Sequence, residues 1–246
     1  MKTSFIIPNY NYGEFLPECL DSLIAQKYED WEAILVDDAS TDNSWEILTE
    51  YQKQDSRIII IKGEHKGPQG ATNTGLERSS GEFISMVGSD DKVDPNFWNT
   101  TLPYFYNSKI GVVSIGFMEW RPERSEQIWR KPVLVPSIAL ILKTNLIHSA
   151  SPFRREVLND VGYTDEQTPW GDWDFWIRVL FKGWQIAYCH KPVVWYRVHD
   201  KSITQTMDQS SAGENINYIK NKYKELYKLY NISKDGSYAE DFGIEY

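Results

Sequence analysis

Residues 33–42 read AILVDDASTD, and this stretch indicates the fold class of the chain. Its first four residues form a short apolar run, which is typical of a strand buried on both faces. Two aspartates follow at once, and Ser40, Thr41 and Asp42 are then residues that form turns and begin helices. A strand, a polar turn and a helix in this order predict one unit of an α/β sheet.

The same pattern recurs on both sides of this stretch. Short β-branched runs stand at residues 5–7, 58–61, 83–87 and 112–115. Helical patterns lie between them, at residues 15–24 and 45–51. Because strands alternate with helices, we expect an α/β fold with a mostly parallel central sheet flanked by helices. In such sheets ligands bind at the carboxyl ends of the strands.

The second half of the chain is less regular. Residues 117–147 mix tryptophans, basic residues and three prolines, which predicts a folded-over loop or a hairpin. Two helices are then expected at about 152–160 and 172–182, and two short strands at 185–188 and 193–196.

Composition narrows the class of protein. The 246 residues are 41% hydrophobic and 25% charged, as in a soluble α/β domain with or without a small C-terminal extension. A net charge of −9 argues against nucleic acid as a main partner. The apolar run that ends at Pro8 is too short for a signal peptide, and Cys19 and Cys189 match no zinc spacing. We therefore expect a cytoplasmic protein.

Two acidic doublets stand at the carboxyl ends of predicted strands. Asp37 and Asp38 follow one strand, and Asp90 and Asp91 follow another. One such doublet is more typical of a turn or a helix cap. Two doublets at one sheet edge favour function, because adjacent like charges are unfavourable unless a cation or hydrogen-bond donors compensate them. Oxygen ligands of this kind suit Mn²⁺ or Mg²⁺ rather than zinc.

A third acidic motif, WGDWDFW at residues 170–176, begins a predicted helix. Two interpretations of Asp172 stay open. It can cap the helix, or it can be a general base whose pKa is raised by the flanking tryptophans. Asp174 lies two positions on, so it cannot face the same ligand.

With these motifs assembled, the sequence resembles family 2 of the glycosyltransferases, whose catalytic domain has the Rossmann-like GT-A fold. The resemblance runs from Phe5 to about Ile203. It rests on residues 4–11 (SFIIPNYN), 20–26 (LDSLIAQ), 34–42 (ILVDDASTD), 81–84 (GEFI), 89–91 (SDD), 153–157 (FRREV), 161–163 (VGY), 171–178 (GDWDFWIR) and 196–199 (YRVH). Each segment is weak alone, but their order and spacing are specific.

The resemblance implies roles for the donor-side residues. Pro8 and Tyr10 belong to the loop that holds the nucleotide base, with Tyr10 stacking on it. Asp38 matches the carboxylate that hydrogen-bonds the base. Asp91 matches the metal ligand, and Asp90 matches the contact to ribose or sugar.

The resemblance also implies the reaction. Asp172 matches the catalytic base, and Arg197, His199 and Ser202 match a loop that closes over the diphosphate, where the histidine completes the metal site. We therefore expect an inverting enzyme that moves one sugar from a nucleoside-diphosphate sugar, with UDP the best guess, to a hydroxyl of a glycan or lipid-linked acceptor. Mn²⁺ or Mg²⁺ is the expected cofactor.

The implied organisation is one GT-A domain. Residues 1–205 form the catalytic domain, with a nucleotide-sugar half at 1–115, an acceptor half at 116–205 and a helical extension at 206–246. Within the acceptor half, two tryptophans among basic residues are candidates for the acceptor site: Trp120 and Trp129. The alternative is a solvated basic loop over core aromatics.

One position departs from the family pattern. Where the family often has Ala-Arg-Asn-x-Gly, residues 71–75 read ATNTG, so Thr72 replaces an arginine expected near the diphosphate. Lys66 and Arg78 are candidates to replace that cation. The Gln-x-x-Arg-Trp signature of processive synthases is absent, so we expect transfer of single sugars.

Three alternatives stay open. A helix expected near 214–230 has an apolar stripe and several lysines, so it either packs on its own domain or docks at the inner face of the plasma membrane. The protein could also be a non-catalytic nucleotide- or glycan-binding relic. The third alternative is a sugar-nucleotide nucleotidyltransferase. That class needs a Gly-rich N-terminal loop with basic residues to bind a triphosphate, and residues 8–13 (PNYNYG) match such a loop poorly.

Overall fold

The computed structural model describes residues 1–133, 137–206, 209–230 and 232. Of the predicted extension at 206–246, residues 207–208, 231 and 233–246 lie outside the described residues. Within the described residues, one sheet has the strand order β3-β2-β1-β4-β8-β6-β9-β5, and β7 pairs with β6. The strands are β1 (Thr3–Asn9), β2 (Trp31–Asp37), β3 (Ile58–Lys62), β4 (Phe83–Met86), β5 (Lys92–Val93), β6 (Ile110–Arg121), β7 (Glu126–Arg130), β8 (Phe153–Arg154) and β9 (Gln185–Arg197).

The sheet is mostly parallel, as the sequence predicts. Strands β3, β2, β1 and β4 run in one direction, and β6 and β9 are parallel to each other. The two-residue strand β8 is antiparallel to both β4 and β6 and joins the two blocks. All parallel strands therefore end at the same edge of the sheet.

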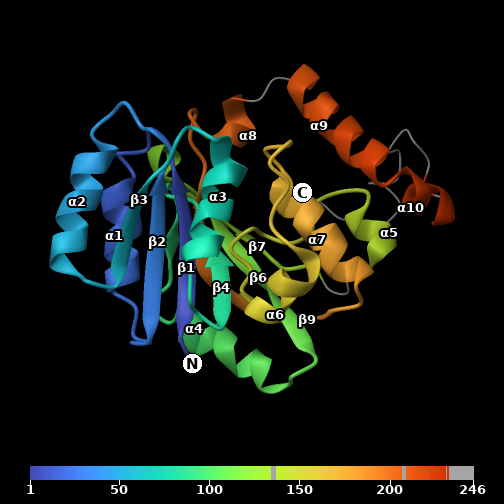
Figure 1. Cartoon of the computed structure of the whole chain (residues 1–246), viewed down its shortest axis with the longest axis horizontal. Coiled ribbons are helices and arrows are strands. Elements are labelled where there is room, and N and C mark those ends of the chain that lie inside the picture. Colours follow the sequence, from blue (N-terminus) through green and yellow to red (C-terminus); the bar gives the residue numbers. More distant parts are fainter. Residues whose placement is uncertain (134–136, 207–208, 231, 233–246) are drawn as a thin grey trace.

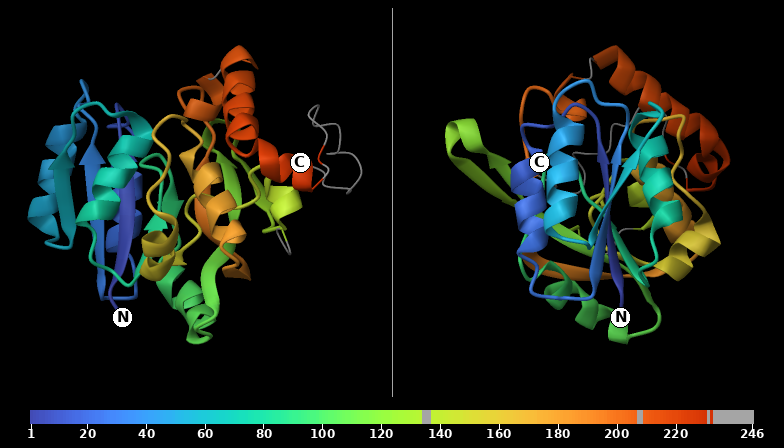
Figure 2. Two further views of the ribbon diagram at one scale, coloured as in Figure 1. Left: turned by 45° about the vertical axis from the view of Figure 1, so that its right-hand side comes forward. Right: turned by 60° about the vertical axis from the view of Figure 1, so that its left-hand side comes forward.

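Helices cover both faces of this sheet (Figures 1 and 2). They are α1 (Leu16–Ile24), α2 (Ser44–Gln54), α3 (Gly67–Arg78), α4 (Phe97–Thr101), α5 (Ile138–Ile141), α6 (Arg155–Val161), α7 (Gly171–Phe181), α8 (Ile203–Thr206), α9 (Gln209–Lys222) and α10 (Lys224–Leu229), with 3₁₀ turns η1 (Leu102–Tyr106) and η2 (Pro122–Arg124).

Successive residues of each central strand serve opposite faces. Phe5 and Ile7 of β1 belong to the core under α1, α2 and α4, whereas Ile6 belongs to the core under α3 and α7. All three side chains are completely buried. This two-sided burial is why the strands read as unbroken apolar runs, and it holds the carboxyl ends of the strands in a rigid row.

The second half differs from its prediction most clearly at β9. The expected hairpin is observed as β6, η2 and β7. The two strands expected at 185–188 and 193–196 are one strand, β9, whose pairing with β6 shifts register around Gly116. The polar interruption in the sequence is therefore an irregularity within one strand rather than a loop. The expected boundary between residues 115 and 116 falls inside β6.

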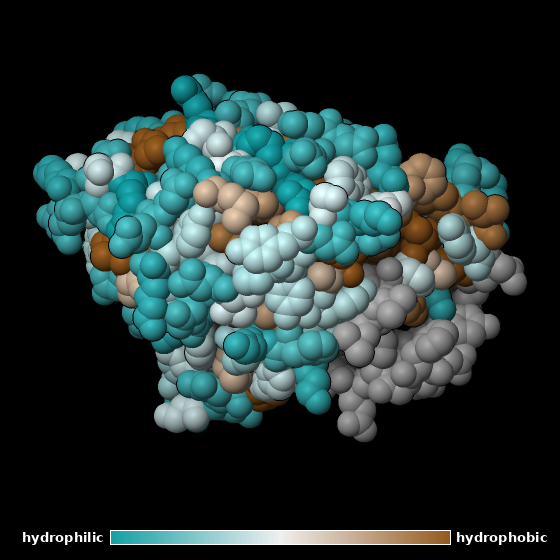
Figure 3. Space-filling model, turned by 90° about the horizontal axis from the view of Figure 1, so that it is seen from below, coloured by the Kyte–Doolittle hydropathy of each residue, from teal (hydrophilic) through white to brown (hydrophobic). Residues whose placement is uncertain are grey.

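The helix expected at 214–230 is divided at Tyr223 into α9 and α10. Its stripe packs on the domain, since Ile219 is completely buried and Ile216 and Tyr223 lie against the same core as α7. No helix in the described ranges has the length and apolar character to cross a bilayer. Apolar atoms gather at the α5 and α10 end of the molecule (Figure 3, right), where Leu229 is 73% exposed.

Candidate active site

A cavity of about 990 Å³ opens at the carboxyl edge of the sheet. Its walls come from both halves of the chain: the ends of β1 and β4, the start of α3, strands β6 and β7, the start of α7, and helices α8 and α9. Three predicted site residues line it: Pro8, Trp129 and Asp172. Gly88, which precedes the second doublet, also lines it. We call this space the active-site cavity.

On the donor side, Asp38 directly follows β2, and its side chain forms hydrogen bonds with the start of α3. Its carboxylate is buried and accepts the backbone N–H groups of Lys66 and Gly67, both at 2.8 Å. These donors belong to the beginning of α3, where the helix dipole favours negative charge. Tyr10 is 43% exposed and lies against His65, with ring centroids 4.6 Å apart, so part of its ring surface is open at this edge.

The second doublet is closed over by the end of β9. Asp91 is 3% exposed, and its Oδ1 accepts the backbone N–H of Arg197 at 2.9 Å. Arg197 Nε donates to the Asp90 carbonyl oxygen at 2.8 Å, and His199 Nε2 lies 3.1 Å from Asp90 Oδ2. Burial, together with the neighbouring charge of Asp90, raises the pKa of Asp91 well above its usual range.

Gly88 separates this doublet from the active-site cavity. It lines the cavity, and a Cβ atom at this position would lie 2.5 Å from Asp90 Oδ1 and 3.1 Å from Asp91 Oδ2. A side chain there would collide with both carboxylates. Glycine therefore lets the end of β4 stand between the cavity and the doublet without displacing either aspartate.

The residues present fit part of a divalent-cation site. His199 Nδ1 is buried and has no hydrogen-bond partner within the described part of the chain, and Asp91 is a buried carboxylate with little compensation. Oxygen and imidazole donors suit Mn²⁺. Across the described residues, no three His, Cys, Asp or Glu side chains form a complete metal site. Asp91 and His199 would therefore need further ligands to hold a cation.

The loop after β9 is held tightly. The Arg197 guanidinium lies 4.1 Å from the Trp120 ring centroid and 4.9 Å from that of Phe15, and it is ion-paired with Glu18 at 3.2 Å. Ser202 donates its hydroxyl and its N–H to the His199 carbonyl oxygen, at 3.0 and 3.1 Å. These contacts fix the loop against the second doublet.

Asp172 lines the cavity at the start of α7. Trp170 occupies the N-cap position of α7, so Asp172 is the second residue of the helix rather than its N-cap, and backbone N–H groups of the first turn still bond to its carboxylate. Its half-buried carboxylate accepts a hydrogen bond from Asn145 Nδ2 at 2.9 Å. Burial raises the pKa of Asp172, and the Asn145 hydrogen bond partly opposes this. Asp174, in contrast, is completely buried and bonded to α9.

The two acceptor candidates occupy different places. Trp129 lines the cavity, beside Arg130 and Lys131. Trp120 is not among the lining residues: its ring has Lys92 Nζ 3.6 Å from its centroid, in addition to Arg197. The physical reason is the alternation of side chains along β6, which places Trp120 on the face of Arg197 rather than on the cavity face.

Three further residues line this wall: Glu119, Asn145 and His148. Asn145 holds Asp172, and nothing in the irregular sequence around it indicates this role. Glu119 binds Arg121 and Arg130, at 2.5 and 2.8 Å; burial alone would raise its pKa, but these hydrogen bonds lower it. Burial lowers the pKa of His148 to about 4, so this imidazole is neutral.

The structure shows where Thr72 lies and which of the two candidate cations is near the site. Thr72 lines the cavity and donates its hydroxyl to the Pro68 carbonyl oxygen at 2.8 Å within α3. Lys66 stands beside Asp38 at the start of α3, with its side chain 55% exposed. Arg78 is the last residue of α3, about 16 Å along the helix from its start, so it cannot replace the missing cation.

Comparison with known proteins agrees with this geometry. The chain is 26% identical over 239 residues to the E. coli UDP-Glc:alpha-D-GlcNAc-diphosphoundecaprenol beta-1,3-glucosyltransferase WfaP, covering 94% of this chain and 85% of WfaP. The first four curated relatives align over only 14% to 65% of their own length.

Two solved structures share the fold. S. aureus TarS 1-349 in complex with UDP-GlcNAc superimposes with a TM-score of 0.72 and 21% identity, covering 85% of this chain and 62% of that one. The Pyrobaculum calidifontis mannosyltransferase PcManGT, in complex with GDP-Man and Mn²⁺, gives 0.70 and 17%, covering 91% and 64%. The family model described as glycosyl transferase family 2 matches residues 4–162. The chain therefore belongs to glycosyltransferase family 2.

Proposed function

We propose that this protein is an inverting glycosyltransferase that moves one sugar from a nucleoside-diphosphate sugar to a hydroxyl of a lipid-linked or glycan acceptor. The observation that carries the proposal is that one cavity is lined by Asp172 and by Gly88, and that Gly88 stands between this cavity and the second doublet. Asp172 has a raised pKa and one side-chain hydrogen-bond donor, Asn145, on one wall. Gly88, next to Asp90 and Asp91, lies on another.

These positions suit a single displacement. The acceptor oxygen would bond to the anomeric carbon as the bond from that carbon to the diphosphate oxygen breaks. The diphosphate leaves with the electron pair, and Asp172 takes the proton of the acceptor hydroxyl. Attack from the face opposite the leaving group inverts the anomeric centre.

Asp91 and His199 would hold a divalent cation together with diphosphate oxygens of the donor. Such a cation supplies charge neutralisation for the leaving diphosphate. Support comes from the orphaned His199 Nδ1 and from the structural neighbour that contains GDP-Man and Mn²⁺. Tyr10 and Asp38 lie at the same edge, and uracil is the base we favour because TarS is in complex with UDP-GlcNAc and WfaP is named for UDP-Glc.

The acceptor side of the cavity combines cations with apolar surface. Arg130 and Lys131 lie beside Trp129, and Ile203 and Ile216 contribute apolar walls. Because Glu119 already compensates Arg130, and the exposed Lys131 has no carboxylate paired with it in the described part of the chain, Lys131 provides positive charge for an acceptor in this group. This surface suits an acceptor with an anionic phosphate and an apolar chain, in line with the diphosphoundecaprenol acceptor named for WfaP.

The test measures binding and turnover separately. Thermal shifts with UDP-glucose, UDP-GlcNAc and GDP-mannose, each with Mn²⁺ or with EDTA, identify the donor, because a ligand at a hundred times its Kd adds about 2.7 kcal/mol of stability. Transfer to undecaprenyl-diphosphate-linked GlcNAc is then followed, and NMR of the new linkage reports the anomeric configuration.

Each alternative predicts a different result. A retained anomeric configuration would refute direct displacement. If the donor binds in a metal-dependent way but is neither transferred nor slowly hydrolysed, the result would favour the non-catalytic relic. Release of pyrophosphate from a nucleoside triphosphate and a sugar phosphate would indicate a nucleotidyltransferase.

A further inference from the structure

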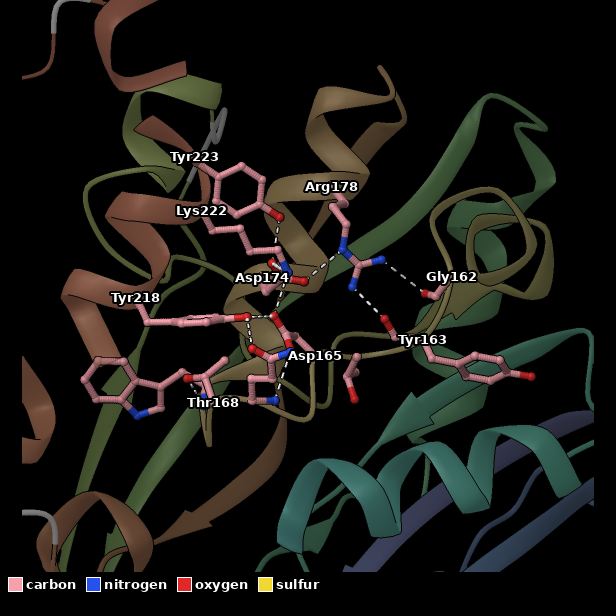
Figure 4. Close-up of polar contacts among 12 residues, drawn as sticks. Gly162, Tyr163, Asp165, Thr168, Asp174, Arg178, Tyr218, Lys222 and Tyr223 are labelled. Atoms are coloured by element: carbon pink, nitrogen blue, oxygen red, sulfur yellow. Dashed lines mark hydrogen bonds and ion pairs between the residues drawn. The ribbon is translucent and has the colours of Figure 1, made fainter. Parts of the chain in front are cut away.

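Helix α7, which carries Asp172, is tied to the C-terminal helix α9 by a polar network (Figure 4). At its centre is Asp174, whose side chain is completely inaccessible to solvent. Its Oδ2 accepts Arg178 Nε at 2.8 Å, from the next turn of α7. Its Oδ1 accepts the Tyr223 hydroxyl at 2.6 Å and is ion-paired with Lys222 Nζ at 2.7 Å.

The same lysine reaches the segment that precedes α7. Lys222 Nζ lies 2.6 Å from Asp165 Oδ2, and the Tyr218 hydroxyl donates to that oxygen at 2.7 Å. Arg178 Nη2 donates to the Tyr163 carbonyl oxygen at 2.6 Å. One cation from α9 therefore holds both the first turn of α7 and the segment leading into it.

The opposite side of this segment is held by α3. Asn73 Nδ2 donates to the Thr164 carbonyl oxygen, and Asn73 Oδ1 accepts the Thr164 N–H, at 2.9 and 3.0 Å. Gln69 Nε2 donates to the Pro169 carbonyl oxygen at 2.9 Å. The approach to Asp172 is thus clamped between α3, whose start bonds to Asp38, and α9.

We propose that Lys222 and Tyr223 are positioning residues for Asp172, and that α9 is therefore a working part of the active site rather than an appendage. This inference rests on the proposed role of Asp172 as general base. Asp172 and Asp174 are separated by one residue in the first turn of α7, so a shift or rotation of that turn moves both. Ile216 of the same helix lines the cavity, which places α9 at the acceptor as well.

Positioning explains this network better than stability alone. Burying an ion pair is a weak way to stabilise a fold, because the desolvation of both charges offsets much of their attraction. A displacement of about 1 Å at a catalytic group, however, can cost on the order of a hundredfold in rate. A buried carboxylate with two cations and a hydroxyl determines one orientation of the turn.

The first test compares Tyr223→Phe with Tyr218→Phe. Both remove one hydroxyl that donates to a carboxylate, Tyr218 from α9 and Tyr223 from the residue that directly follows α9, but only Tyr223 is bonded to Asp174. We expect Tyr223→Phe to lower kcat about tenfold with the donor KM unchanged, and Tyr218→Phe to stay within about twofold of wild type. A lower Tm with unchanged kcat in Tyr223→Phe would reduce the contact to a structural one and overturn the inference.

A second variant tests the charge. Among the described residues, Arg178, Lys222 and Tyr223 contact Asp174, and Tyr218 and Asp165 lie next to them. Removing Lys222 leaves more of the Asp174 charge acting on Asp172. Lys222→Met should therefore move the acid limb of kcat upward by about half a pH unit. Lys222→Arg should restore the wild-type limb. The same limb in Lys222→Met and wild type would contradict the proposal.

A readout without turnover separates this inference from the proposed function. Amide hydrogen exchange at residues 170–175 should be faster in Tyr223→Phe than in wild type or Tyr218→Phe. If wild type transfers no sugar but exchange changes in this way, the function fails and the coupling of α9 to the turn stands. Unchanged exchange at these amides would overturn the coupling whatever the activity, and it can be measured even on a destabilised variant.

Discussion

Replacing Asp172 with asparagine is the sharpest test of the proposed mechanism. Asparagine has nearly the same shape, and its carbonyl oxygen can still accept the Asn145 hydrogen bond, but it cannot take a proton. Loss of a general base costs about 10² to 10⁴ in rate, or roughly 3 to 5 kcal/mol of transition-state stabilisation. We expect kcat for Asp172→Asn to fall by this factor while donor and metal affinity stay the same, because Asp172 lies on the acceptor wall.

The pH profile follows from the direction of the pKa shift. A general base accepts a proton only in its ionised form. With Asp172 in this role, kcat should fall as the pH drops through the pKa of Asp172. Since burial raises that pKa, the acid limb should lie above the value of about 3.9 for an ordinary aspartate. The residual activity of Asp172→Asn should lack this limb.

The Tm of Asp172→Asn supplies an independent check, because the direction of the pKa shift predicts whether the variant is more or less stable than wild type. The folded pKa of Asp172 lies above its unfolded value, so above the unfolded pKa ionisation of this carboxyl lowers the stability of the folded state. Asp172→Asn should therefore have an equal or higher Tm at neutral pH, and this difference should disappear below the unfolded pKa.

Asp174→Asn is the matched control. It removes the charge shared by Arg178 and Lys222 and should lower Tm, since breaking a buried pair typically costs about 3 kcal/mol. A folded Asp172→Asn enzyme with near-normal kcat would refute the mechanism. The search for a base would then move to Asp174 or to His148, which is neutral because burial lowers its pKa to about 4.

Three further predictions concern the cofactor, the acceptor and the membrane. Asp91→Asn should weaken donor binding in Mn²⁺ but not in EDTA, as measured by calorimetry; equal loss in both would remove Asp91 from the metal site. Trp129→Ala should raise the acceptor KM and leave donor binding unchanged, whereas lower donor affinity would contradict its place on the acceptor wall. If α10 docks on membranes, sedimentation with anionic liposomes at low salt should retain the protein, and Lys224→Glu with Lys228→Glu should abolish retention; no retention of wild type leaves only the packing role.

The sheet and its acidic edge could be predicted because their signals are local. Apolar runs followed by aspartates identify the carboxyl ends of β2 and β4, and the topology then brings these ends together. Helix α3 was not predicted, since Gly67, Gly70 and Gly75 lower helix propensity. Packing requires Gly75: a Cβ there would lie 2.6 Å from Ile6 Cγ2.

The acceptor wall was less predictable for a different reason. Whether Trp120 or Trp129 reaches the cavity depends on the pleat and twist of β6 and β7, which the sequence of an irregular hairpin does not reveal. The contact from Asn145 to Asp172 spans 27 positions and follows no periodicity. The clamp on Asp174 likewise joins residues 49 positions apart, so only the fold brings them together.

Compensation of charge distinguishes the structural acids from the functional ones around this cavity. Asp174 has two cations and a hydroxyl, and burial alone would raise the pKa of Asp165, but hydrogen bonds led by Lys222 lower it. These carboxylates hold elements together. Asp91 and Asp172 are the acids in which burial prevails and the pKa is raised. Leaving the buried Asp91 and the half-buried Asp172 undercompensated lowers the stability of the fold, and stability alone gives no reason to keep them. A cation beside Asp91 and an acceptor proton near Asp172 would each supply the missing positive charge, and the proposed reaction uses both at these two places.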